Sequence, residues 1–195
     1  MNINFSLKNK NIILTGAAGI LGQKLSQAYL DAGANLALLD INKNELDKLQ
    51  KNLRSKKNNY FNTYYTDITK EEHIKKTIKL IVNKFSSIDV LHNNAATKGD
   101  SIEDFLKPFE QYKLATWNNV INGNLSSMFI MSKLVGKYMK KQNYGNIIQT
   151  ASIYGVIPPD KNIYKNSFYN GFEISSPASY SVSKNGVIGL TKYLA

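Results

Sequence analysis

The 195-residue sequence contains no cysteine, a single arginine and no long hydrophobic run. The lack of cysteine excludes disulfide bonds, thiolate metal sites and a cysteine nucleophile, and it suits the reducing cytoplasm, where we expect the protein to act. The apolar run Ile12–Leu14 is far too short for a signal peptide or a membrane span, so we expect a soluble chain with no membrane partner. No cluster of metal ligands is visible in the sequence, and no metal site is predicted.

The net charge of +11 requires nucleic acid to be considered as a partner. However, 24 of the 25 basic residues are lysines, and Arg54 is the only arginine. Arginine dominates base readout and bidentate phosphate contacts, and the sequence does not interleave aromatic with basic residues as single-strand binders do. We therefore expect no nucleic-acid partner. The lysines are spread over predicted helix faces, and their charge can still steer an anionic cofactor or a phosphorylated substrate.

Short apolar runs alternate with longer helical patterns along the chain. Strands are expected at Asn11–Leu14, Leu36–Leu39, Tyr60–Tyr65, Ile88–His92 and Asn146–Thr150. Helices are expected at Ile20–Ala32, Glu45–Leu53, Glu71–Phe85, from Thr116 as N-cap to about Lys140, and from Ala178 onward. Such alternation predicts a parallel sheet covered on both faces, that is, an α/β, doubly wound, Rossmann-type fold. No repeat or linker divides the chain, so residues 1–195 are predicted to form one domain.

The segment Thr15–Gly22 directly follows the first strand and opens the first helix. Its small residues let the backbone approach a pyrophosphate, and the helix N-terminus offers unpaired N–H groups and a favourable dipole. A Walker loop is excluded, because no Lys-Ser/Thr pair follows Gly22. The segment therefore predicts a dinucleotide site. Its predicted binding residues are Gly16, Gly19, Ile20, Leu21 and Gly22.

Asp40 ends the second strand, 18 residues after Gly22. An acidic side chain at this place can accept hydrogen bonds from both hydroxyls of the adenosine ribose, and it repels a 2′-phosphate. The predicted cofactor is therefore NAD rather than NADP, although Lys43 lies nearby and NADP stays the alternative.

Tyr180 and Lys184 lie one turn apart on the last predicted helix. Hydride transfer at a secondary alcohol needs a group that takes up or supplies the hydroxyl proton. A free tyrosine has a pKa of about 10, too high for a base at neutral pH, and a nearby ammonium favours the phenolate. The position of this pair after the fifth strand, in a chain with a glycine turn, predicts an acid–base pair.

Taken together, these segments resemble the short-chain dehydrogenase/reductase family over essentially the whole chain. The matching segments occur in the order Thr15–Gly22, Asp40, Asp67–Ile68, Asn93–Ala96, Asn124–Leu125, Ser152–Gly155, Tyr180 and Lys184. The resemblance implies that Tyr180 is the catalytic acid or base, and that Lys184 lowers the pKa of Tyr180 and holds the nicotinamide ribose. It implies that Ser152 orients the substrate oxygen and that Asn124 holds a proton-relaying water chain.

The same resemblance extends the cofactor site. It implies that Asp67 and Ile68 flank the adenine, and that Asn93 and Ala95 line the cofactor near the fourth strand. It also leads us to expect a homo-oligomer for the full-length protein.

Three features depart from the family pattern. The glycines fall as T-G-x-x-G-x-x-G, a spacing usual in the branch acting on nucleotide sugars, whereas Trp117–Phe129 looks classical. Ser152 and Tyr180 are 28 residues apart, and the insertion 156–177 is predicted either to form part of the substrate pocket or to be a surface loop or oligomer contact. Family members continue beyond this last helix, so we expect a C-terminally truncated fragment that is inactive or poorly stable.

The leading hypothesis is an NAD(H)-dependent oxidoreductase that interconverts a hydroxyl and a carbonyl group. The pattern is similar to bacterial members of surface-glycan and flagellin-modification pathways, which suggests a polar small molecule such as a sugar or sugar phosphate as substrate. The alternatives are a nucleotide-sugar epimerase or dehydratase with retained NAD, and a non-catalytic dinucleotide sensor.

Overall fold

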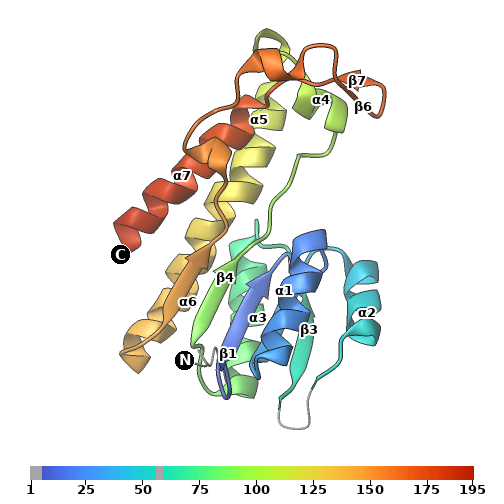
Figure 1. The fold of residues 1–195 in the computed structure, drawn as a ribbon. Helices are drawn as coiled ribbons and strands as arrows, with labels where there is room; N and C mark the ends of the chain where they lie inside the picture. The colour runs from blue at the N-terminus through green and yellow to red at the C-terminus, as the bar shows by residue number, and fades with distance from the viewer. Residues whose placement is uncertain (1–5, 56–58) are drawn as a thin grey trace, which may run out of the picture. The chain divides into compact units, whose positions relative to one another are not determined.

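The computed structural model describes residues 6–55 and 59–195, which fall into two compact units. The sheet unit comprises the described residues up to Ala95 together with Ile130–Gln149, and the helical unit comprises Ala96–Phe129 and Thr150–Ala195. Figure 1 follows the chain through both units. The single domain predicted for residues 1–195 stays a prediction.

The sheet unit is built on five parallel strands in the order β3-β2-β1-β4-β5. The strands are β1 (Asn11–Thr15), β2 (Asn35–Asp40), β3 (Phe61–Tyr65), β4 (Val90–Asn93) and β5 (Asn146–Gln149). The order reverses direction after β3, because the chain returns past β1 to form β4 on its other side. This reversal makes the fold doubly wound, as predicted. In such sheets, ligands bind where the strand order reverses, which here is at the carboxyl ends of β1 and β4.

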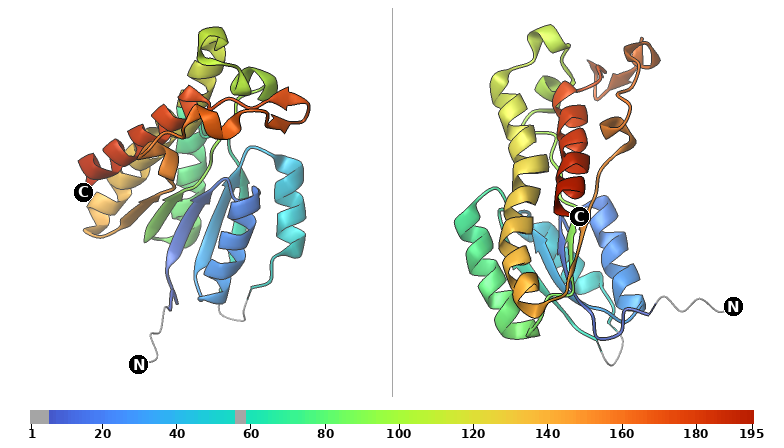
Figure 2. Two further views of the ribbon diagram at one scale, coloured as in Figure 1. Left: turned by 45° about the horizontal axis from the view of Figure 1, so that its top comes forward. Right: turned by 90° about the vertical axis from the view of Figure 1, so that its left-hand side faces the viewer.

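Helices cover both faces of this sheet (Figure 1, and Figure 2, right). Helices α1 (Ile20–Asp31) and α2 (Lys43–Asn52) lie on one face, and α3 (Glu71–Phe85) and the 130–142 part of α6 (Ser127–Gln142) lie on the other. Successive residues of β1 serve opposite faces, because side chains alternate along a strand. Ile12 and Leu14 pack under α1 and α2, while Ile13 packs under α3. Burial on both faces explains why the strands read as continuous apolar runs.

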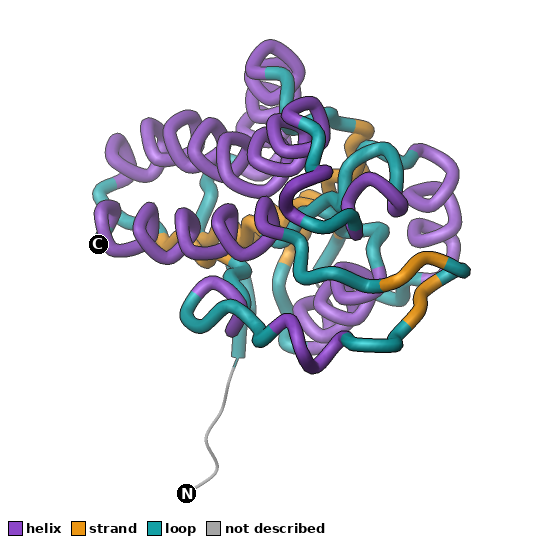
Figure 3. Tube along the Cα trace, turned by 90° about the horizontal axis from the view of Figure 1, so that it is seen from above, coloured by secondary structure: helices purple, strands orange, loops and turns teal. Residues whose placement is uncertain are grey.

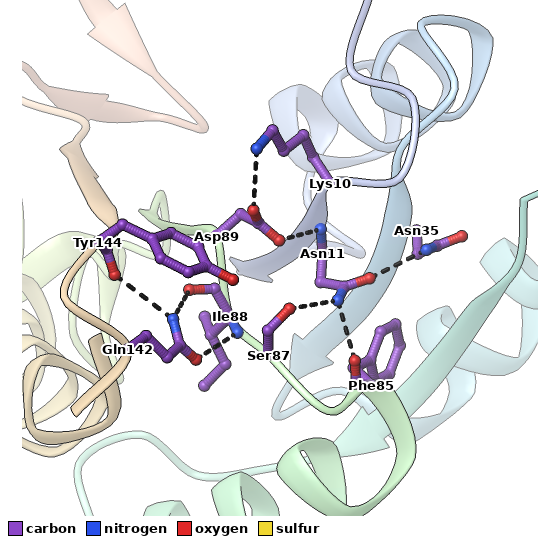
Figure 4. Close-up of polar contacts among 9 residues, drawn as sticks. All are labelled: Lys10, Asn11, Asn35, Phe85, Ser87, Ile88, Asp89, Gln142 and Tyr144. Carbon is purple, nitrogen blue, oxygen red and sulfur yellow. Dashed lines mark hydrogen bonds and ion pairs between the residues drawn. The ribbon is translucent and has the colours of Figure 1, made fainter. Parts of the chain in front are cut away.

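Polar side chains tie the amino-terminal ends of β1, β2 and β4 together (Figure 4). The Asn11 amide donates to the Phe85 carbonyl oxygen at 3.0 Å and to Ser87 at 2.9 Å, and its oxygen accepts from Asn35 at 2.9 Å. The Asp89 carboxylate accepts from the Asn11 backbone N–H at 2.9 Å. These bonds satisfy polar backbone groups at the strand starts that have no partner in the sheet. They connect the strands at the end of the sheet opposite to the predicted site.

The helical unit consists of short elements and one long helix. It contains α4 (Ile102–Leu106), α5 (Leu114–Ile121), a π-helical turn (Asn122–Ser126), the start of α6, the hairpin β6 (Phe168–Tyr169) and β7 (Phe172–Glu173), and α7 (Ala178–Leu194). Single 3-10 turns span Phe109–Gln111, Ile153–Gly155 and Lys161–Tyr164. In Figure 3 the hairpin appears as two short strands connected by a loop to the beginning of α7. The core of the helical unit is formed by Phe105, Leu106 and Val120.

The predicted elements of the sheet unit are confirmed, with boundaries shifted by a few residues. The predicted N-cap at Thr116 is wrong, because the helix begins at Leu114 after Lys113. The predicted single helix to Lys140 is interrupted by the π-helical turn at Asn122–Ser126. The stretch 155–177, for which no regular structure was predicted, contains the β6–β7 hairpin. Among the described residues, no helix is long and apolar enough to cross a membrane.

Candidate functional site

The glycine turn between β1 and α1 has the close packing that the sequence predicts. Gly16 has φ +65°, and a Cβ on it would lie 2.7 Å from the Ala95 Cα. A Cβ on Gly22 would overlap with the Gly16 carbonyl oxygen and lie 2.8 Å from the Ala17 Cα. Both positions therefore require glycine, the first for its backbone angle and the second for space.

The first turn of α1 leaves backbone donors open. Its N-cap, Gly19, has no side chain to cap the helix. Within the part of the chain that the structure describes, the first N–H of the helix with a backbone acceptor is that of Gln23, which bonds to the Gly19 carbonyl oxygen at 2.9 Å. The N–H groups of Ile20, Leu21 and Gly22 thus remain available, at the positive end of the helix dipole. Three such donors beside a turn without side chains fit the pyrophosphate of a dinucleotide.

Thr15 and Asn94 hold this turn against the end of β4. The Thr15 hydroxyl accepts from the backbone N–H groups of Asn94 at 3.0 Å and Ala95 at 3.1 Å. The Asn94 amide donates to the carbonyl oxygens of Thr15 at 3.2 Å and Gly16 at 3.3 Å. Sequence reasoning did not assign a role to these two side chains. Their role depends on β1 and β4 being neighbours, which no local pattern reveals.

Asp40 lies at the carboxyl end of β2 and is tied to the glycine turn. One carboxylate oxygen accepts from the Ala18 N–H and the other from the Asn42 N–H, both at 2.9 Å. Each oxygen keeps one lone pair, so the carboxylate can still accept ribose hydroxyls. The residues directly after Asp40 line an open pocket of about 450 Å³. Its lining residues are Ile41, Asn42, Lys43, Asn44 and Tyr65.

The remaining predicted cofactor residues of the sheet unit differ in how far their side chains are engaged. One Asp67 oxygen accepts from the backbone and hydroxyl of Thr69, at 2.9 and 2.6 Å. Ile68 packs against the core on the α3 face. The Asn93 side chain is buried and donates to Ser132 at 3.2 Å and Gln149 at 3.1 Å. Ala95 contacts the turn through its backbone. Direct contacts of these four residues with a cofactor stay predictions.

Lys184 is a deeply buried charged side chain of the helical unit. It is only 2% exposed, and its ammonium donates to the Thr150 carbonyl oxygen at 2.7 Å. Burial lowers the pKa of Lys184, because the charged form loses hydration. The Nζ atom lies 5.8 Å from the centre of the Tyr180 ring. The predicted pair is therefore brought together, one turn apart on α7, with two of the three ammonium N–H donors not used by Thr150.

Asn124 lies in the π-helical turn and is completely buried. Its amide oxygen accepts from the Thr97 N–H at 2.7 Å, and its amide nitrogen donates to the Thr97 carbonyl oxygen at 3.2 Å. The Asn124 amide thereby pairs with both polar backbone groups of Thr97, as a neighbouring β-strand would. A π-helical turn widens the helix by one residue and often occurs at functional sites. These two hydrogen bonds hold the backbone after β4, and the role of Asn124 in a water chain stays a prediction.

The turn that carries Ser152 packs directly on α7. The Ser152 hydroxyl accepts from the Tyr154 N–H at 3.2 Å and caps the 3-10 turn Ile153–Gly155. A Cβ on Gly155 would lie 2.5 Å from the Lys184 carbonyl carbon, and the Asn185 amide donates to the Gly155 carbonyl oxygen at 2.8 Å. The helix α7 therefore gathers the predicted catalytic residues within the helical unit, whereas the predicted nucleotide-binding turn belongs to the sheet unit.

Two polar contacts near the catalytic pair were missed by sequence reasoning. The Tyr112 hydroxyl lies 2.6 Å from the hydroxyl of Ser179, the buried residue before Tyr180. Burial raises the pKa of Tyr112. The hydroxyls of Tyr154 and Tyr164 lie 2.8 Å apart, and this contact raises the pKa of Tyr164 to about 12. No spacing signal in the sequence pairs residues 112 and 179, because they belong to different elements.

Comparisons with known proteins show the family of the chain. A family model described as short chain dehydrogenase matches residues 10–195. The chain is 32% identical to the 3-oxoacyl-(acyl-carrier-protein) reductase of Thermotoga maritima over 186 residues, 95% of this chain and 67% of the relative. It is 32% identical to the post-translational flagellin modification protein A of Campylobacter coli over 192 residues, 97% of this chain and 71% of the relative.

A solved structure has the same fold. The crystal structure of an NAD⁺-bound xylitol dehydrogenase superposes with a TM-score of 0.82 at 31% sequence identity, covering 96% of this chain and 64% of that one. The chain thus spans about two thirds of the length of the proteins that it matches.

Proposed function

The chain belongs to the short-chain dehydrogenase family. We propose that it is part of an oxidoreductase that interconverts a hydroxyl and a carbonyl group with NAD as cofactor. In this proposal Tyr180 is the acid–base residue. The observation that carries this proposal is the buried Lys184 ammonium, held by Thr150 at 2.7 Å and 5.8 Å from the Tyr180 ring centre. A charged lysine is rarely buried without a function, because desolvation of the ammonium is costly.

The sheet unit supplies the groups that would hold the cofactor. The open N–H groups of Ile20, Leu21 and Gly22 would bind the pyrophosphate, and Asp40 would accept the ribose hydroxyls. A 2′-phosphate would meet the negative charge of the Asp40 carboxylate, which is held by two backbone N–H donors. This arrangement supports NAD over NADP. When bound, NAD⁺ would accept the hydride in the oxidation direction, and NADH would supply it in the reduction direction.

Tyr180 would transfer the proton. In the oxidation direction its phenolate takes the proton of the substrate hydroxyl, and in the reduction direction the phenol returns it. The Lys184 ammonium would face the charge that develops on the tyrosine oxygen during proton transfer. Thr150 takes only one ammonium N–H, and the other two can serve the phenolate and a ribose hydroxyl. Ser152, on the turn that packs against α7, would donate to the substrate oxygen.

The names of two relatives support a proposal for the substrate class. Xylitol, the substrate named for one solved relative, is a polyol, and another relative is named for flagellin modification. A polar, sugar-like substrate is therefore proposed, handled in the cytoplasm, where NAD is available.

The test compares the protein with its Tyr180→Phe variant in an NADH absorbance assay over a panel of polyols and sugars. Removal of the acid–base group is expected to lower kcat by roughly 100- to 10,000-fold, while the affinity for NAD, measured by calorimetry, stays the same. Turnover that survives in Tyr180→Phe would refute the assignment. NAD that co-purifies without net turnover would instead indicate an epimerase or dehydratase.

A further inference from the structure

Lys98 and Tyr169 meet although they are 71 positions apart. The Lys98 ammonium lies 5.3 Å from the centre of the Tyr169 ring. Lys98 belongs to the segment between β4 and α4, and Tyr169 to strand β6 of the insertion. Both side chains are exposed. An ammonium over a tyrosine face is attracted by the ring, so the contact favours this placement of the lysine and leaves the ammonium accessible to solvent.

The Lys98 segment is anchored beside the candidate catalytic residues. Thr97 is bonded at both its N–H and its carbonyl oxygen to the buried Asn124 side chain. A Cβ on Gly99 would make ordinary contact with Val120, at 3.7 Å. Lys98 therefore follows a residue whose backbone is bonded to the π-helical turn, and it precedes Gly99, whose N–H donates to the Thr97 hydroxyl at 3.0 Å.

The hairpin that carries Tyr169 is anchored on the same core. Ile174, directly after β7, packs on the cluster formed around Val120, and the Tyr180 ring packs on that cluster as well. The Ser175 N–H donates to the Leu106 carbonyl oxygen at 3.2 Å. Figure 1 shows the hairpin close to α4. Both halves of the Lys98–Tyr169 pair thus rest on the core that also supports the candidate acid–base residue.

Lys98 differs in its charge environment from the nearby lysines. Lys107 and Lys113 form ion pairs with Asp104 at 3.5 and 3.1 Å. Lys98 has no carboxylate partner in the described ranges 6–55 and 59–195, where the carboxylate of its neighbour Asp100 is bonded to Asn119 at 2.6 Å. One side of the ammonium faces the ring, and among the described residues no hydrogen-bond acceptor lies within reach of it. A positive charge that is positioned but not neutralised suits a negatively charged ligand.

We propose that the Lys98–Tyr169 pair selects substrates that carry an anionic group, a carboxylate or a phosphate, in addition to the reacting hydroxyl. This inference rests on the proposed function and names its substrate class: acidic sugars or phosphorylated polyols rather than neutral polyols. The compact ammonium recognises charge more than shape, so it accepts both kinds of anion. The insertion then acts as a specificity element, because it supplies the ring that positions the lysine.

The test uses three matched ligands on the protein at its natural length: D-sorbitol, D-gluconate and D-sorbitol 6-phosphate. For each ligand, turnover is followed by NADH absorbance and binding to the NAD-loaded protein by calorimetry. The variants are Lys98→Gln, Lys98→Arg, Tyr169→Leu and Tyr169→Phe, with Lys165→Gln, an exposed lysine of the insertion, as charge-matched control.

The unaltered protein is expected to bind at least one anionic ligand more tightly than D-sorbitol. Lys98→Gln should lower this preference by roughly 10- to 100-fold, the effect of one charge-assisted hydrogen bond. Lys98→Arg should lose less than Lys98→Gln, Tyr169→Phe less than Tyr169→Leu, and Lys165→Gln should keep the preference. Equal binding of the three ligands, or a preference unchanged in Lys98→Gln, overturns the inference.

The two proposals fail separately. If Tyr180→Phe abolishes turnover while Lys98→Gln keeps the preference for anions, the inference is wrong and the proposed function stands. If the anion preference depends on Lys98 while turnover survives in Tyr180→Phe, the substrate class is right and the assignment of Tyr180 is wrong.

Discussion

Two Gly→Ala substitutions in helices of the sheet unit are predicted to have opposite effects on stability. Gly136 lies in α6, and a Cβ on it would meet no atom within 4 Å. Gly22 lies in the first turn of α1, where a Cβ would overlap with the Gly16 carbonyl oxygen. Since alanine is favoured over glycine in a helix by about 0.8–1 kcal/mol, helix propensity alone predicts that both variants are stabilised.

The structure predicts otherwise for Gly22. The Gly136→Ala variant should gain about 0.5–1 kcal/mol in the free energy of unfolding, which raises Tm by roughly 2–4 °C. In Gly22→Ala the turn backbone must move away, an overpacking cost of about 1–3 kcal/mol that exceeds the propensity gain. We expect Tm to fall by several degrees and the affinity for NAD to fall at least about 10-fold, because the displaced turn includes the pyrophosphate donors.

The assay is thermal unfolding of both variants by circular dichroism, without NAD and with saturating NAD. The increase in Tm upon NAD addition should be preserved in Gly136→Ala and reduced in Gly22→Ala. A Gly22→Ala variant that is stabilised like Gly136→Ala, with an unchanged NAD response, would show that the turn is not packed as described.

Three further predictions concern single polar contacts. Asn11→Leu should lower the free energy of unfolding by about 3 kcal/mol in urea titrations, because it removes one buried and two partly buried side-chain hydrogen bonds (Figure 4); a loss below about 1 kcal/mol would contradict this. Burial lowers the pKa of His92, so the unfolded chain takes up this proton first and stability falls as the pH drops below about 6.5; His92→Gln should lose part of this slope. Tyr112→Phe and Ser179→Ala should each cost about 1 kcal/mol, and the double variant little more, because they break the same hydrogen bond; additive losses would refute the coupling.

The sequence predicted the features that depend on residues close together in the chain. The glycine turn is an example, because Gly16, Gly19 and Gly22 lie within one strand–helix connection and their spacing has a direct steric meaning. The alternation of apolar runs and amphipathic segments likewise predicted all five parallel strands. The Tyr180–Lys184 pair is local as well, since one helical turn brings both side chains to the same face.

Contacts between distant segments were not predictable in this way. The bonds of Asn94 to the glycine turn require β4 to lie beside β1, and the Tyr112–Ser179 contact requires a 3-10 segment to reach the start of α7. Neither pairing leaves a periodic signal. The β6–β7 hairpin was missed for a different reason: each strand has two residues, which is too short for an alternating pattern to be recognised.

Asn124 illustrates how a functional prediction and a structural role can coincide. The sequence marks this asparagine only through its resemblance to a family motif, and the structure places it at the π-helical turn, fully buried and bonded to both polar groups of the Thr97 backbone. An ordinary α-helical turn would rotate the residues after Asn124 by about 100° relative to this arrangement. The extra residue of the π turn therefore lets Asn124 fix the segment that continues into Lys98. The same asparagine that the motif assigns to proton relay thus also determines where the proposed anion-selecting lysine stands.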